Sequence, residues 1–316
     1  MKARIGAGSP HFNSRVARMI SGISCRQVIS DSDFDDVYRL RYDAYLNEQA
    51  IHPSQSRRLV DKFDLSSNGA VFGFYSNDDL IASLRIHVAS KAFPDSPAME
   101  TFADYLERYV EDDVVIVDCN RFVIRADASR TCYALPYIVV RLGHMASAYF
   151  SAKIATATVR REHQAFYKRI FNFEQICEPR HYPTLTKPLS LMTLDFPAER
   201  DSIEARYPFV QSSAEEREAR FGHWADRMRR MVEARWNPTF PVAISSDVAA
   251  HNRGQEALIS QPMPDGPVTT ANCLSQGLRA PAPSWSISPL GRVRPTGTGP
   301  KGVHMHVGSR QLMAVA

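Results

Sequence analysis

Helical and strand patterns alternate between residues 30 and 196, and this alternation constrains the fold more than any other feature of the sequence. Apolar residues keep helical spacing in four segments, at 31–49, 97–109, 135–150 and 162–171. Apolar runs typical of strands lie around them, at 70–75, 80–88, 114–124, 153–160, 173–177 and 189–196. Such an order predicts one α/β domain over residues 29–197, with a mixed central sheet and helices on both faces.

The segments on either side of this domain carry different patterns. In residues 1–28 charged side chains interrupt every apolar patch, so we expect a flexible leader. Residues 198–237 contain a predicted helix that begins at Ser213, with Glu216 completing a capping box. We expect this helix to dock on the domain through an apolar stripe made by Phe221, Trp224, Met228, Met231 and Val232.

The chain of 316 residues ends in a segment of distinct composition. Residues 250–316 hold 8 of the 20 prolines, 8 of the 15 glycines, and six Lys or Arg against two acidic residues. They account for the whole net charge of +4, so residues 1–249 are neutral. We expect residues 238–316 to form a disordered tail rich in Pro, Gly and Ser. Because the basic charge belongs to this tail, it does not indicate a folded nucleic-acid-binding surface.

Several function classes are excluded by what the sequence lacks. No run approaches the roughly 18 apolar residues that span a bilayer, so we expect no stable membrane insertion and no secretory signal. The five cysteines form no C-x-x-C pair, which argues against a disulfide framework or a zinc site. Motifs of dinucleotide-binding proteins, P-loop NTPases, serine hydrolases and zinc proteases are missing. We therefore expect a cytoplasmic protein with no metal, no bound cofactor and no nucleic-acid partner.

Charged residues occupy positions that face a core in three predicted elements. Arg41 lies on the apolar face of the first predicted helix, and Arg85 lies in the second strand of a predicted hairpin. Asp118 and Arg121 interrupt the apolar strand at 114–124. Each residue alone is consistent with an ion pair or with a side chain that reaches solvent. Together they form a candidate site.

Five motifs in this order resemble the acyl-homoserine-lactone synthases and the long-chain N-acyl amino acid synthases. They are Arg41 with Tyr45, the box Asp61-x-x-Asp64, Ser83-Leu84-Arg85-Ile86, Asp118-Cys119-Asn120-Arg121-Phe122 and the helix at 162–173. The last of these is similar to a signature helix of the wider GNAT acyltransferase superfamily. The resemblance covers roughly residues 30–196 and implies a GNAT-like fold, that of the acyl-CoA N-acyltransferases.

Three departures favour the N-acyl amino acid synthases. Homoserine-lactone synthases carry a Trp shortly after the first-helix aromatic residue, where this chain has Gln49-Ala50-Ile51. They also carry Glu at the position of Asp118 and usually Ser at that of Asn120. The resemblance thus implies an N-acyltransferase that joins a fatty acyl group to the amine of an amino acid. Two alternatives stay open: a homoserine-lactone synthase that uses S-adenosylmethionine, and a non-catalytic sensor of acyl carriers or acyl chains.

The chemistry of amide formation suggests roles for these residues. The attacking amine must lose a proton, and Asp118 is the candidate base. Arginine forks bind carboxylates through two contacts, so an amino-acid acceptor has three candidate partners: Arg41, Arg85 and Arg121. We expect Asp61 and Asp64 to offset the arginine charges, and Tyr45 to complete the substrate-binding site.

The middle of the strand at 114–124 poses a geometric problem, because Asp118 and Arg121 point to opposite faces of a regular strand. A β-bulge near Cys119 or Asn120 would bring them to one face, and the GNAT resemblance implies such a bulge.

The same resemblance implies two further catalytic groups. A freed backbone N–H close to Phe122 or Val123 would polarise the thioester carbonyl. Tyr167 would protonate the leaving thiolate, unless it is a helix tyrosine that only packs on the sheet.

The acyl donor is predicted from a missing feature. Relatives that use coenzyme A cradle its pyrophosphate with a glycine-rich turn, whereas the turn at 125–132 contains no glycine. We therefore expect the phosphopantetheine arm of acyl carrier protein as donor and this acidic protein as partner. The expected docking residues, which could instead form a solvated face, are Arg125, Arg130, Arg160, Arg161, Lys168 and Arg169.

Overall fold

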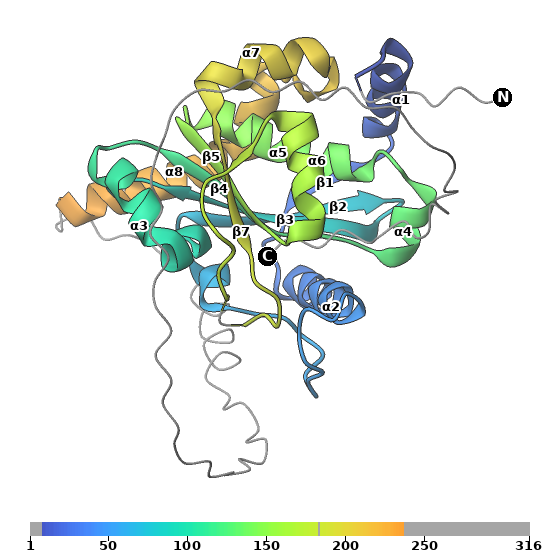
Figure 1. The fold of residues 1–316 in the computed structure, drawn as a ribbon, viewed down its shortest axis with the longest axis horizontal. Helices are drawn as coiled ribbons and strands as arrows, with labels where there is room; N and C mark the ends of the chain where they lie inside the picture. The colour runs from blue at the N-terminus through green and yellow to red at the C-terminus, as the bar shows by residue number, and fades with distance from the viewer. Residues whose placement is uncertain (1–7, 183, 237–316) are drawn as a thin grey trace, which may run out of the picture. The chain divides into compact units, whose positions relative to one another are not determined.

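A seven-stranded sheet forms the centre of the structure, a computed structural model that describes residues 8–182 and 184–236 (Figure 1). The strand order is β1-β2-β3-β4-β5-β7-β6. Among the described strands only β4 and β5 are parallel, and the other neighbours are antiparallel. The predicted mixed sheet is therefore confirmed. The strands are β1 (Ser24–Gln27), β2 (Gly69–Ser76), β3 (Asp79–Ala89), β4 (Ile116–Ile124), β5 (Ile154–Val159), β6 (Glu174–Gln175) and β7 (Ser190–Asp195).

Helices cover both faces of the sheet (Figure 1). One face, which we call the α2 face, carries α2 (Asp31–Asn47), the 3₁₀ helix η1 (Lys62–Leu65) and α3 (Pro97–Glu111). The opposite face, the α5 face, carries α1 (Pro10–Ile20), α5 (Leu135–Tyr149), α6 (Gln164–Phe171), α7 (Phe196–Arg206) and α8 (Ala214–Trp236). The short helices α4 (Ala126–Thr131), η2 (Arg161–His163) and η3 (Pro208–Val210) lie in the connections. No described helix is long and apolar enough to cross a bilayer.

The two faces of the central strands differ in chemistry although both are buried. On β3, Leu84 and Ile86 belong to the large core under α5. Their neighbours Ser83, Arg85 and His87 are equally buried but point to the α2 face, because side chains alternate along a strand. A buried polar surface on one side of the sheet must be matched by hydrogen bonds or ion pairs. The α2 face is therefore where a polar site has to be sought.

Residues 8–28 correct the prediction of a flexible leader. Ser9 caps α1, and Phe12 and Val16 are buried in the main core. Arg15 and Arg18 occupy the exposed side of the same helix. The charges that interrupt the apolar patches are thus the solvent face of an amphipathic helix rather than a sign of disorder.

The C-terminal part of the described chain contains one predicted and one unpredicted helix. Phe221 and Trp224 of α8 are fully buried and pack on the ring of Phe72 in β2, which confirms the docking stripe. Helix α7 could not be predicted from periodicity, because only Phe196 and Ile203 of that helix are buried. The predicted disordered tail at 238–316 lies outside the described residues.

Candidate active site

A bulge in β4 decides which of its side chains reach the α2 face. β3 and β4 pair in register from Ala89 to Arg85, but Leu84 alone then stands opposite two residues, Arg121 and Phe122. Arg121 takes the left-handed backbone conformation with φ 50°. This bulge brings Arg121 to the same face as Asp118, as the sequence required, and lies one residue beyond the predicted position.

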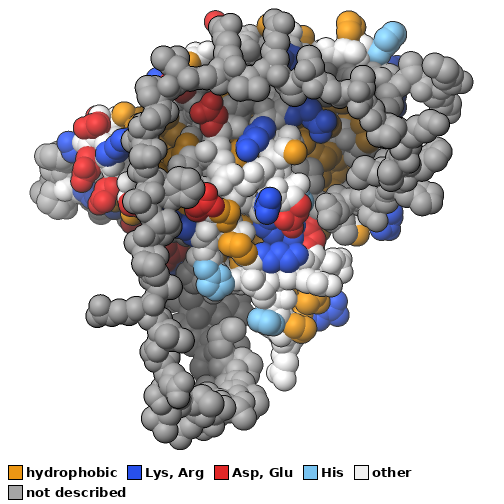
Figure 2. Space-filling view, viewed as in Figure 1, with side chains coloured by type: hydrophobic (Ala, Val, Ile, Leu, Met, Phe, Trp, Pro, Cys, Tyr) orange, Lys and Arg blue, Asp and Glu red, His pale blue; other side chains and the backbone are white. Residues whose placement is uncertain are grey.

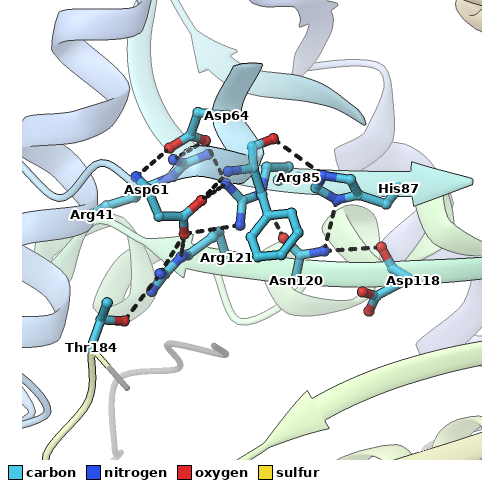
Figure 3. A network of polar contacts seen from close by, with 10 residues as sticks. Arg41, Asp61, Asp64, Arg85, His87, Asp118, Asn120, Arg121 and Thr184 are labelled. Atoms are coloured by element: carbon cyan, nitrogen blue, oxygen red, sulfur yellow. Dashed lines mark hydrogen bonds and ion pairs between the residues drawn. The ribbon is translucent and has the colours of Figure 1, made fainter. Parts of the chain in front are cut away.

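The acidic box is built by the cap of a short helix. Asp61 is the N-cap of η1 and accepts from the Phe63 N–H at 2.9 Å, while Asp64 accepts from the Asp61 N–H at 3.0 Å. A reciprocal capping box needs two side chains that accept hydrogen bonds, three positions apart, and Asp61 and Asp64 supply them here. Both carboxylates consequently lie close together against the sheet (Figure 3).

Arg85 joins both carboxylates to the sheet, and each of its three nitrogens has a hydrogen-bond partner. Its Nη1 lies 2.6 Å from Asp61 Oδ1 and 2.7 Å from Asp64 Oδ1, and its Nη2 lies 3.1 Å from Asp61 Oδ2. Its Nε donates to Asn120 Oδ1 at 2.7 Å. Burial opposes its charge, but Asp61 and Asp64 outweigh this effect and raise the pKa of Arg85. Arg85 therefore braces the two aspartates against the sheet, so Arg41 and Arg121 are better placed to hold a substrate carboxylate, and the predicted role of Arg85 in substrate binding stays a prediction.

Arg121 and Arg41, in contrast, keep N–H groups without a partner. Arg121 Nε and Nη2 donate to Asp61 Oδ2 at 3.0 and 2.6 Å, and Arg41 Nη1 donates to Asp64 Oδ1 at 2.7 Å. The described residues offer no partner to Arg121 Nη1 or to Nε and Nη2 of Arg41, although these atoms are buried. The predicted cluster is assembled, with three arginines around two aspartates (Figure 3).

Aromatic rings enclose the Arg121 guanidinium. Its central carbon lies 5.4 Å from the ring centre of Tyr45 in α2 and 5.9 Å from that of Tyr182. Burial opposes ionisation of Asp61, but Arg85 and Arg121 hold the pKa of its carboxyl well below the ordinary range. The pair therefore stays charged, and Tyr45 lies at the site as predicted.

Asp118 is buried at the same face, at the far end of the network. Its Oδ2 accepts from the Ala98 N–H at the start of α3 at 3.0 Å, and its Oδ1 accepts from the Thr156 hydroxyl at 3.1 Å. Burial raises the pKa of this carboxyl, and the hydrogen bonds to Ala98, Ser96 and Thr156 counteract part of the rise. A raised pKa makes a carboxylate a stronger base, and the same contacts also anchor α3 to the sheet.

The parallel strands β4 and β5 separate beyond the site. Their pairing runs from Ile116 opposite Ile154 to Cys119 opposite Ala157 and then ends, so the described part of β4 after Cys119 has no β5 partner. The Arg125 N–H donates to Ile81 O, on the β3 side. Because N–H directions alternate along a strand, the N–H of Val123 also points toward β3 and that of Phe122 points toward β5.

This alternation separates the two predicted backbone donors. The N–H of Phe122 faces the opening between β4 and β5, whereas the N–H of Val123 faces a paired strand. Phe122 thus fits the predicted role and Val123 does not.

Tyr167 lies on the α5 face, beside this opening. Together with Cys119 and Gly143 it lines a cavity of about 40 Å³ whose walls are almost wholly apolar. Burial, with smaller contributions from Cys119 and Tyr45, raises the pKa of Tyr167 well above its ordinary value. The hydroxyl is therefore protonated at neutral pH, as a proton donor to a thiolate must be.

The predicted docking residues do not all lie at the surface. Arg160 is buried in an ion pair with Glu48 and contacts His163 Nε2 at 2.6 Å, so it cannot belong to a docking surface. Arg125 is partly exposed and pairs with Asp127 at 2.7 Å. The other four side chains are exposed: Arg130, Arg161, Lys168 and Arg169. On the face in Figure 2, basic side chains of the described residues alternate with acidic ones.

Sequence reasoning missed two groups of site residues. His87 and Asn120 form part of the network, and the strand alternation that places His87 beside Arg85 could have identified it. Tyr182 and Thr184 come from the irregular segment before β7, where no pattern in the sequence points to the site; Thr184 Oγ1 lies 3.5 Å from Arg121 Nη2.

Comparisons with solved structures find weak similarity to acyltransferases. One is FeeM, an N-acyl amino acid synthase from uncultured soil microbes, with 15% identity, a TM-score of 0.48, and coverage of 57% of this chain and 93% of that one. Another is the CoA-dependent acyl-homoserine lactone synthase BjaI, with 14% identity, a TM-score of 0.44, and coverage of 60% and 90%. The synthase LasI shows 11% identity, a TM-score of 0.45, and coverage of 60% and 96%. The comparison with curated proteins gave no match.

The family comparison is decisive. The model of the N-acyl amino acid synthase FeeM matches residues 36–195, which is more than half of the chain. The matched region includes most of α2, both acidic box residues, the β4 bulge and Tyr167. The chain belongs to the FeeM family of N-acyl amino acid synthases, and it is an N-acyltransferase.

Proposed function

We propose that this enzyme transfers a fatty acyl group from the phosphopantetheine arm of acyl carrier protein to an amino acid whose carboxylate is held by Arg41 and Arg121. The observation that carries the proposal is the imbalance of the buried cluster, in which three guanidinium groups meet two carboxylates. A buried excess of positive charge with unpartnered N–H groups is costly unless an anion joins it. The carboxylate of an amino-acid acceptor supplies that anion.

A carboxylate bound there leaves the acceptor's amine near β4. The acceptor arrives as an ammonium ion, and Asp118 takes one of its protons so that the nitrogen lone pair can attack the thioester carbonyl. The Phe122 N–H, which faces the opening between β4 and β5, donates a hydrogen bond to the oxyanion that develops. Bond formation between nitrogen and carbon is followed by cleavage of the carbon–sulfur bond.

The departing thiolate and the acyl chain of the donor lie, in this proposal, on the opposite face of the sheet, the α5 face. Tyr167 gives its proton to the departing thiolate and regains one from the nitrogen as the amide forms. The apolar cavity beside Tyr167 and Gly143 takes part of the acyl chain. The products are the N-acyl amino acid, the free thiol of the carrier arm and one proton.

The carrier protein docks, in this proposal, where the parallel strands end. β4 and β5 run in the same direction, so Arg130 after β4 and Arg161 after β5 follow the same edge of the sheet. Lys168 and Arg169 extend the exposed positive charge along α6, the helix that carries Tyr167. Such a surface suits an acidic partner. We expect the enzyme to act in the cytoplasm, as predicted from the sequence.

The proposal is tested with purified enzyme and four combinations of substrates. The donor is either acyl carrier protein or coenzyme A with the same acyl group, and the acceptor is either an amino acid or the amine that lacks its carboxylate. We expect the carrier-bound donor and the intact amino acid to give the highest kcat/KM. Equal kcat/KM for the amino acid and its decarboxylated amine would refute the carboxylate assignment, and a preference for coenzyme A would refute the donor assignment.

A further inference from the structure

His87 is a buried imidazole in β3 that the reaction described above does not use. Its Nε2 lies 3.2 Å from the carbonyl oxygen of Phe63, and its Nδ1 lies 3.2 Å from Asn120 Nδ2. The ring also meets that of Phe63 edge to face at 5.7 Å. Gly69 on β2 makes room for it, because a Cβ at this position would lie 2.7 Å from His87 Nε2. The imidazole is thus enclosed from three sides.

The hydrogen bonds around His87 can run in only one direction. A backbone carbonyl only accepts, so Nε2 must carry the hydrogen that is donated to Phe63 O. Nδ1 then carries a lone pair and accepts from the Asn120 amide. The second N–H of that amide donates to Asp118 O at 3.1 Å. Asn120 Oδ1 is left to accept from Arg85 Nε, which fixes the orientation of the amide.

This chain of bonds connects η1, β3 and β4, the elements that carry the charged residues of the cluster other than Arg41. Phe63 belongs to η1, the helix whose cap supplies Asp61 and Asp64. His87 therefore ties the segment that carries both carboxylates to β3 and, through Asn120, to the strand that carries Arg121. The imidazole is neutral, since burial and the nearby Arg85 lower the pKa of His87 to about 3.

We propose that His87 is a positioning residue of the acceptor site. Its imidazole orients Asn120 and holds η1, and both contacts keep Arg85 bonded to the two aspartates. Arg41 and Arg121 consequently retain their free N–H groups for the acceptor's carboxylate. This inference rests on the proposed function, because the position it preserves is the one assigned to that carboxylate.

Three substitutions distinguish the contribution of the Asn120 contact from that of the Phe63 contact. His87→Phe removes both hydrogen bonds, His87→Asn can keep an acceptor near the position of Nδ1, and His87→Gln can keep a donor near the position of Nε2. Asn68→Ala is the matched control, because Asn68 is buried and donates to Val88 O and Asp95 O next to the same strand without touching the cluster. It lowers stability without altering the acceptor site.

The readout is the KM for the acceptor beside the KM for the acyl donor, together with thermal unfolding of each variant. We expect His87→Phe to raise the acceptor KM by about tenfold or more, as for the loss of a hydrogen bond that orients a charged group, with the donor KM unchanged. His87→Asn should raise the acceptor KM much less than His87→Phe does, and His87→Gln should raise it by an intermediate amount. Asn68→Ala should lower the melting temperature and leave both KM values unchanged.

Two outcomes would overturn the inference. One is an acceptor KM that stays within about twofold in both His87→Phe and His87→Gln; the other is a parallel rise in both KM values. If His87→Phe does not fold, His87→Gln carries the decision. Arg121→Lys is measured in parallel so that the two proposals can be told apart. A changed acceptor KM in that variant with none in the His87 variants rejects only the role of His87, whereas no change in either rejects the carboxylate site itself.

Discussion

Arg121 and Asp61 meet across 60 positions of sequence, and two nitrogens of the arginine donate to one carboxylate oxygen, Oδ2, at 3.0 and 2.6 Å. The contact depends on the left-handed backbone of Arg121, which costs a residue other than glycine about 1–2 kcal/mol. The buried ion pair offsets that cost and carries the guanidinium to the α2 face. Backbone strain at the bulge and recognition at the site are therefore linked.

The first prediction concerns this arginine. Arg121→Lys keeps a positive charge for Asp61 but removes the fork that binds a second carboxylate. We expect the acceptor KM to rise by about 10- to 100-fold, corresponding to about 1.5–3 kcal/mol for lost charge-assisted hydrogen bonds, with little change for the acyl donor. Steady-state kinetics with each substrate varied in turn measure both values. An unchanged acceptor KM would remove Arg121 from the binding site.

The second prediction concerns Asp118. Asp118→Asn retains an oxygen for the Ala98 N–H but cannot accept a proton from the ammonium ion. We expect kcat to fall by about 10²- to 10⁴-fold, the usual range for a general base. In the native enzyme, kcat/KM should fall as the pH drops through the pKa of this carboxyl, and that acid limb should vanish in the variant. If only the stability changes, Asp118 acts as an anchor of α3 and not as the base.

The third prediction tests Tyr167 by changing the leaving group. Tyr167→Phe should slow transfer from the natural alkyl thioester, because the thiolate leaves without a proton. Transfer from an aryl thioester, whose thiol is far more acidic, should be affected much less. Tyr137→Phe provides the control, since Tyr137 is a partly buried tyrosine that packs on Phe12 of α1. Equal slowing with both thioesters would assign Tyr167 a packing role.

The fourth prediction concerns acyl chain length. A Cβ at Gly143 would lie 2.6 Å from Cys119 Sγ, at the wall of the apolar cavity. Gly143→Ala should therefore reduce the space for the acyl chain and shift the products toward shorter chains, despite the better helix propensity of alanine. The double variant Cys119→Ala/Gly143→Ala should restore longer chains. Mass spectrometry of products from a mixed acyl donor pool shows the shift, and an unchanged product distribution would place the acyl chain elsewhere.

The fifth prediction concerns stability and pH. Burial lowers the pKa of His163 to about 4, with Arg160 adding to the effect, and lowers that of His87 to about 3. The unfolded chain, with histidine pKa values near 6.5, binds more protons below that pH, so stability decreases as the pH falls. Each histidine should cost about 2 kcal/mol between pH 7 and pH 5. The raised pKa of Asp118 acts in the opposite direction and offsets part of this loss.

Urea unfolding at both pH values measures the effect. His163→Gln keeps an acceptor for Arg160 and should reduce the loss of stability between pH 7 and pH 5 by about 2 kcal/mol. A loss that is identical in the variant and in the native protein would show that His163 does not titrate on unfolding.

Much of the fold and most of the site could be predicted from the sequence. Periodicity located β2 to β7 and the helices α2, α3, α5, α6 and α8, but it missed β1, α1 and α7. The mismatch between Asp118 and Arg121 required a bulge. The position of the bulge at Arg121 could not be predicted. The left-handed conformation there is stabilised by the contact with Asp61, and no local sequence pattern indicates that contact. Arg160 resembled its exposed neighbours in sequence, and only the position of Glu48 at the end of α2 shows why it is buried.

The different contacts of the three arginines could not be predicted from the sequence either, because they depend on the three-dimensional structure. The sequence presents Arg41, Arg85 and Arg121 as equivalent forks. Only the hydrogen bonds show that every nitrogen of Arg85 is engaged by Asp61, Asp64 or Asn120, whereas the other two arginines keep nitrogens without a partner among the described residues.

The most direct test of this account is a comparison of kcat/KM for an amino acid and for the amine that lacks its carboxylate, with the same acyl carrier protein donor and with product identified by mass spectrometry. We predict an N-acyl amino acid as product and a kcat/KM at least about 100-fold lower for the amine, with most of this difference lost in Arg121→Lys. Equal values for the two acceptors in the native enzyme would contradict the account.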